Sequence, residues 1–182
     1  MDTKGMAPTG AATAHSLARV ERTAGTRTTC DAIWRALGKA SFAVVSHVNA
    51  AGEPRSSGVV YGLADRRLYT VVAADSWKAR QIITGQRLAV TVPVRRGGIL
   101  ALLVPIPPAT ISFEARAKIH AAGALDLDSL PKKLARLLPD GTQTDTLIIE
   151  LEPEGRFVTY GIGVSLLDMR DPLKARARVA VT

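Results

Sequence analysis

The feature that most constrains the fold is the segment 110–120, in which apolar and polar side chains alternate without interruption. Its apolar positions are Ile111, Phe113, Ala115, Ala117 and Ile119. A period of two places alternate side chains on opposite faces of a β-strand. The sequence therefore predicts a long antiparallel strand with one face against a core and the other toward solvent.

Other segments rich in β-branched and apolar residues predict further strands, at 42–48, 55–61, 68–72, 87–94, 146–151 and 156–160. Turns at 49–52 and 152–155, each ending in glycine, join consecutive strands directly. Helices are predicted at 28–38, 77–84 and 128–138, where capping residue types precede apolar faces. Because most consecutive strands have no helix between them, we expect a mainly β (α+β) fold. Its core is an antiparallel barrel of six or seven strands with about three peripheral helices.

The length of 182 residues and an apolar content of 47% suit one domain with a substantial core. We assign 27–165 to this domain, 1–26 to a flexible tail and 166–182 to a C-terminal arm. No apolar run approaches the roughly eighteen residues that span a bilayer, and the tail lacks a secretory pattern. Together with a single cysteine, Cys30, to which we assign a packing role, this predicts a cytoplasmic protein without membrane contact.

The net charge of +8 and a pI near 10.1 could indicate binding to nucleic acid or to an anionic membrane surface. However, the basic residues are scattered, and aromatic residues make up only 4% of the chain, too few for a base-stacking surface. We therefore expect the charge to serve solubility and an anionic cofactor, with no specific nucleic-acid partner.

The segment 68–85 joins a predicted strand to a predicted helix. Ser76 is a capping type, and Lys78 and Arg80 place two cations near the helix start, where they oppose the helix dipole. One interpretation is that an anion binds there. The other is that Ser76 is a plain cap, that the cations are solvated and that Trp77 packs on a neighbour.

A strand with G-x-P-R-x-S at its start, followed by a strand ending in D-S-x-K-x-R, comes directly after the strand at 42–48. This ordered pattern, from about residue 33 to 94, resembles the flavin-binding split-barrel proteins related to pyridoxamine 5′-phosphate oxidase. The resemblance implies a split β-barrel that binds FMN. It also implies that Arg55 and Lys78 contact the cofactor phosphate, with support from the Ser76 hydroxyl.

The same resemblance places the backbone of Val59, Val60, Val72 and Ala73 along the ring system of the cofactor. Ser57, Trp77 and Arg80 complete the implied cofactor site. Trp77 stands where the oxidase has an arginine, and Arg80 also differs in type. The C-terminal substrate-binding motif of the oxidase is not recognisable, so vitamin B6 is not the expected substrate.

The expected function is that of an FMN-dependent oxidoreductase acting on a small organic molecule, because a redox cofactor supplies chemistry for which the sequence suggests no acid, base or nucleophile. Two alternatives stay open: a reductase that uses the deazaflavin coenzyme, and a non-enzymatic protein that binds flavin or heme or, as a basic protein, RNA. No catalytic residue and no metal site is assigned.

Members of the resembled family bind their cofactor between two subunits, so a homodimer is expected. The apolar passage 99–104 is predicted to lie in the subunit interface or, alternatively, to line a substrate pocket. His47, on the predicted strand 42–48, is assigned a structural role.

Overall fold

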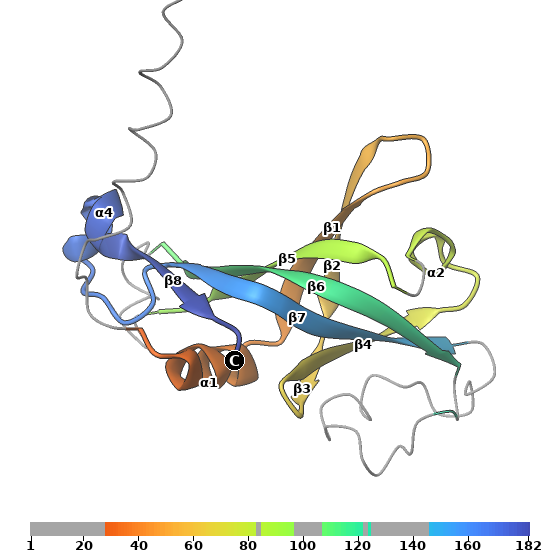
Figure 1. The fold of residues 1–182 in the computed structure, drawn as a ribbon, viewed down its shortest axis with the longest axis horizontal. Coiled ribbons are helices and arrows are strands. Elements are labelled where there is room, and N and C mark those ends of the chain that lie inside the picture. Colours follow the sequence, from red (N-terminus) through yellow and green to blue (C-terminus); the bar gives the residue numbers. More distant parts are fainter. Residues whose placement is uncertain (1–27, 83–84, 97–106, 122–123, 125–145) are drawn as a thin grey trace, which may run out of the picture.

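The computed structural model describes residues 28–82, 85–96, 107–121, 124 and 146–182 (Figure 1). Three predictions lie outside these described residues: the tail 1–26, the conformation of the apolar passage 99–104, and the helix at 128–138.

The described part of the chain contains eight strands and four short helical segments. In chain order they are α1 (Cys30–Lys39), β1 (Phe42–Val48), β2 (Pro54–Val60), β3 (Gly62–Ala64), β4 (Arg67–Ala73), α2 (Trp77–Gln81), β5 (Arg87–Val94), β6 (Ala109–Ala121), β7 (Thr146–Tyr160), η5 (Asp168–Arg170), α4 (Pro172–Ala175) and β8 (Arg176–Ala180).

All strands belong to one antiparallel sheet in the order β2-β1-β5-β6-β7-β4-β3, with β8 paired to β7. The sheet curls around its core, and the long strands β6 and β7 run side by side through its middle (Figure 1). The predicted antiparallel split-barrel fold is confirmed. Within β6 the predicted alternation also holds, since Ile111 and Phe113 are buried while Glu114 and Arg116 are exposed.

β7 differs from the prediction, because it is one continuous strand and not two strands joined by a turn at 152–155. Gly155 adopts a left-handed φ of 68°, and the register between β6 and β7 shifts between Ser112 and Glu114. The strand therefore absorbs these residues as a bulge, which is a common site for a glycine in this conformation. Pro153 stays within the ladder, opposite Ala115.

Two strands were not predicted. β3 has three residues, too few for an alternation to be recognised, and β8 formed part of the arm to which no shape was assigned. α2 is also shorter than predicted, because it ends at Gln81 and not near Gly85.

The core lies inside the curl of the sheet, and α1 covers it. Thr29 caps this helix by accepting a hydrogen bond from the Ala32 amide at 3.2 Å. Trp34 packs edge-on against Phe157 with 5.2 Å between ring centroids. Cys30 has the predicted packing role, since it lies against this core and its thiol donates to a backbone carbonyl. Other large buried side chains are Ile33, Leu37, Leu88, Val90, Ile111, Phe113, Ile149 and Leu151.

Candidate functional site

The candidate cofactor site lies where β4 passes into α2. Ser76 is extended, with φ −65° and ψ 152°, and its hydroxyl accepts a hydrogen bond from the Ala79 amide at 3.2 Å. The predicted helix cap at Ser76 is therefore present. The hydroxyl keeps its own proton, which it can donate to a further acceptor.

Lys78 connects α2 to β2. Its Nζ donates to the carbonyl oxygen of Gly58 at 2.9 Å. Gly58 stands between Ser57 and Val59, two residues that the sequence assigned to the same site. This single contact brings the start of α2 against β2, although about twenty residues separate them along the chain.

Arg55 has a different partner. It forms an ion pair with Glu53 at 2.6 Å, between side chains that are 47% and 54% exposed. No contact within the described part of the chain joins Arg55 to Ser76 or Lys78. A phosphate bound by Arg55 would therefore have to compete with a neighbouring carboxylate in a solvated ion pair.

The four valine and alanine positions of the predicted site fall into two kinds. Val59 and Val72 are buried in the core, whereas Val60 and Ala73 are exposed. Of the two remaining predicted residues on α2, Trp77 is 40% exposed and Arg80 is exposed. The described contacts thus bring Ser57, Val59 and Lys78 together, while Arg55 lies nearer the hairpin end of β2.

Exposed apolar side chains lie on the outer face of β1 and β2, on both sides of a hydrogen-bonded pair of serines, Ser46 and Ser56. Phe42 and Val60 face each other across the two strands and are 45% and 47% exposed. A Cβ added at Gly58 would come within 2.8 Å of the Phe42 ring, so the ring lies directly over this glycine. Val48, on the same face, is 58% exposed. Exposed apolar groups that adjoin one another, as Phe42 and Val60 do, are typical of an interaction surface.

His47, for which a structural role was predicted, lies on β1. It is buried, with 7% exposure, and neither ring nitrogen has a hydrogen-bond partner among the described residues. In the register it stands opposite Arg55. A buried imidazole without partners is unusual in a folded protein and marks a place where a ligand or ordered water could bind. Nothing in the sequence around His47 indicates that its nitrogens are unpaired.

A second polar cluster lies on β4, β6 and β7. Glu150 is 6% exposed and accepts from His120 at 2.7 Å and from Arg67 at 3.1 Å. Burial raises the pKa of Tyr69, and the nearby Glu150 carboxylate raises this pKa further. Because both carboxylate oxygens of Glu150 have cationic or hydrogen-bonding partners, the cluster is fully satisfied and holds three strands together.

Two further features of the described residues bear on function. No group of three or more histidine, cysteine, aspartate or glutamate side chains in them could hold a metal ion. None of the helices in them has the length and apolar character needed to cross a membrane.

Comparison with known proteins identifies the fold. No family model and no curated protein matches the chain. Among solved structures, the chain is similar to a heme binding protein from Mycobacterium smegmatis, with a TM-score of 0.59 and 15% identity over 85% of this chain and 58% of that one.

The chain is also similar to General Stress Protein 26 from Bacillus anthracis, with a TM-score of 0.54 and 18% identity over 71% of this chain and 92% of that one. A FAD-binding protein from Mesorhizobium loti has a TM-score of 0.50 and 14% identity over 66% and 86% of the two chains. At these identities the likeness shows a shared fold. The resemblance to the split-barrel proteins is thereby confirmed at the level of the fold.

Proposed function

We propose that the chain binds FMN between β2 and the β4–α2 junction and acts as an oxidoreductase on a small organic molecule. The observation that carries this proposal is the Lys78–Gly58 hydrogen bond, which brings Lys78 to β2 from a helix that the Ser76 hydroxyl caps. Ammonium and hydroxyl groups are the partners that a phosphate prefers. The side chains present therefore suit the phosphate of FMN, and the fold is shared with a protein described as FAD-binding.

In this proposal each part of the site has a separate task. Lys78 and Ser76 hold the phosphate. Arg55 leaves its ion pair with Glu53 and binds the phosphate in its place. The exposed backbone along Val60 and Ala73 lies beside the ring system. FMN, when bound, supplies the hydride-transfer chemistry. The protein contributes binding, orientation and exclusion of water from one face of the ring.

The deazaflavin coenzyme is an alternative ligand for the same residues, since it also carries a phosphate that Lys78 and Ser76 could hold. The ligand titration below separates it from FMN.

Heme binding without catalysis is a second candidate function, and a specific observation favours it. His47 is buried with both ring nitrogens unpaired, and imidazole nitrogen is a common heme ligand. The fold is also shared with a heme binding protein. In this alternative His47, and not Lys78, is the decisive residue.

A homodimer is part of the proposal. The outer face of β1 and β2 exposes Phe42, Val60 and Val48 to solvent. A second copy related by a two-fold axis would bury these side chains and cover the adjoining cofactor. A cytoplasmic location and no specific nucleic-acid partner remain predictions from composition.

The test is a titration of the purified protein with FMN, the deazaflavin coenzyme and heme, followed by absorbance and fluorescence. FMN is expected to bind saturably, and Lys78→Ala to weaken it while His47→Ala leaves it nearly unchanged. Turnover of the reduced cofactor with an added electron acceptor then distinguishes an enzyme from a storage protein. Saturable binding of heme alone, lost in His47→Ala, would replace the flavin proposal.

A further inference from the structure

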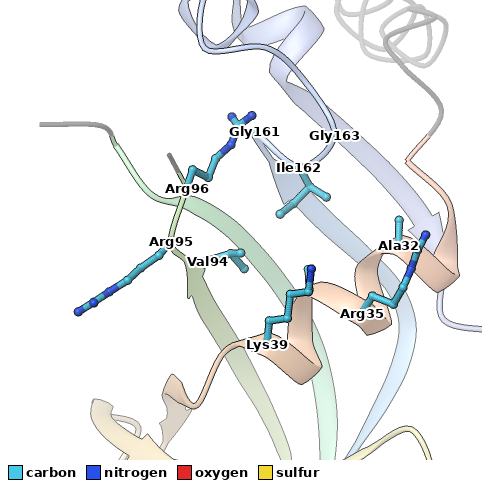
Figure 2. Close-up of a pocket in the computed structure, with 10 residues that line it drawn as sticks. Ala32, Arg35, Lys39, Val94, Arg95, Arg96, Gly161, Ile162 and Gly163 are labelled. Atoms are coloured by element: carbon cyan, nitrogen blue, oxygen red, sulfur yellow. The ribbon is translucent and has the colours of Figure 1, made fainter. Parts of the chain in front are cut away.

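A groove lies at the end of the sheet away from the hairpin of β1 and β2. α1 forms one wall, and the ends of β5 and β7 form the other (Figure 2). Its volume is about 310 Å³. This lies at the lower end of the range for sites that bind small molecules. None of the residues assigned to the cofactor site lines it.

The charge of the groove has one sign. Arg35 and Lys39 line it from α1, and Arg95 and Arg96 line it from the segment after β5. No carboxylate is among its lining residues in the described part of the chain. A concave surface with cations of one sign concentrates anions from solution.

The cations differ in how they are held. Arg96 donates to the Val164 carbonyl oxygen and lies 2.7 Å from the Met169 sulfur, so it is fixed by uncharged groups, and no ion pair within the described residues neutralises its charge. Arg35 donates through Nε to the Asp31 backbone oxygen at 3.3 Å, and its two terminal nitrogens have no partner among the described residues. Lys39 has no ion pair within the described residues.

Arg35 and Lys39 point to a ligand because of their spacing. They are four residues apart on α1, so two like charges lie on one face of the helix, an arrangement that destabilises it. Figure 2 shows both side chains rising from α1 on the side of Ile162, whereas Arg95 points away from the groove. Lys39 in the last turn is favourable for the helix dipole, but this does not account for Arg35 or Arg96.

The floor of the groove is apolar. Val94 and Ile162 line it between the cations, and both are partly buried against the core. An inorganic anion would use only the cationic rim. A ligand with an apolar or aromatic body and anionic groups would use both the rim and the floor.

We propose that this groove binds a small organic molecule that carries two or more negative charges, separately from the cofactor. Phosphate esters and polycarboxylates both carry negative charges of this kind. Arg35 and Lys39 bind the anionic groups directly, Arg96 adds a fixed charge, and Val94 and Ile162 contact the body of the ligand.

Isothermal titration at low salt tests the proposal with four probes: inorganic pyrophosphate, inorganic phosphate, phenyl phosphate and citrate. Arg35→Ala and Lys39→Ala are each expected to weaken pyrophosphate binding about tenfold or more, because each removes a charge-assisted contact. Arg95→Ala should weaken it less than either. Phenyl phosphate should bind more tightly than inorganic phosphate, because its ring reaches the floor. Citrate tests whether the groove also binds a ligand whose only anionic groups are carboxylates.

Arg156→Ala is the matched control, since it removes an exposed cation on β7 that does not line the groove. It should change the affinity less than twofold. Lys78→Ala separates the two sites and should leave pyrophosphate in the groove. Circular dichroism establishes that each variant is folded. The proposal is overturned if pyrophosphate does not bind saturably, if Arg156→Ala weakens it as much as Lys39→Ala, or if Lys78→Ala abolishes it.

Discussion

Replacing Lys78 by alanine gives the most informative test of the candidate cofactor site. In the structure its Nζ donates to the Gly58 carbonyl at 2.9 Å, and the side chain is half-buried. A hydrogen bond to a charged group contributes about 1.5–3 kcal/mol when well shielded from solvent. Because Lys78 is partly solvated, we expect the variant to lose about 1 kcal/mol in its free energy of unfolding.

The effect of Lys78→Ala on cofactor affinity should be larger and selective. If Lys78 also contacts the phosphate of FMN, the lost charge-assisted bond corresponds to roughly ten- to a hundredfold weaker binding, at about 1.4 kcal/mol per decade. Riboflavin has the same ring system and no phosphate, so its affinity should hardly change.

Quenching of flavin fluorescence measures both affinities, and urea unfolding measures the stability term separately. Lys118→Ala is a matched control, because Lys118 is an exposed lysine on β6 outside the site. Equal losses for FMN and riboflavin would mean that Lys78 acts only through the α2–β2 contact. An unchanged affinity for both would refute the assignment of the phosphate to this junction.

Three further predictions concern assembly and stability. Val60→Asp should convert the expected dimer into monomers in light scattering, because a carboxylate replaces an apolar contact. A wild-type protein that is already monomeric would contradict the proposed dimer. Burial raises the pKa of Tyr61, so the unfolded chain loses this proton at a lower pH than the folded protein does. The free energy of unfolding should therefore fall above pH 10 by up to about 1.4 kcal/mol per pH unit. In the Tyr61→Phe variant, urea unfolding should show a smaller fall of this free energy with pH. Gly161→Ala should lower the free energy of unfolding by about 1–3 kcal/mol in urea, because φ is +76° and the new Cβ lies 2.7 Å from the Met169 methyl group. Gly155→Ala, with φ +68° and open space around the new Cβ, should lower it by only about 1 kcal/mol, the cost of the backbone conformation. Equal losses in the two variants would rule out the contact with Met169.

Several features of this protein depend on short-range patterns, and these were predictable from the sequence. The alternation along β6 needs only a period of two, and the Ser76 and Thr29 caps need only a hydroxyl and an amide three residues apart. The antiparallel character of the sheet followed because little chain lies between its strands.

Other features depend on contacts between residues far apart in the chain, and only the tertiary structure decided them. Lys78 bonds to Gly58, although β3 and β4 lie between them along the chain. Glu150 on β7 contacts Arg67 on β4 and His120 on β6. β7 continues through Pro153, which pairs with Ala115 of β6, and past Gly155, beyond which both β6 and β8 pair with it. The cationic groove joins α1 to residues more than fifty positions away. Local propensity carries no information about such pairings, because they form only when the curled sheet brings the segments together.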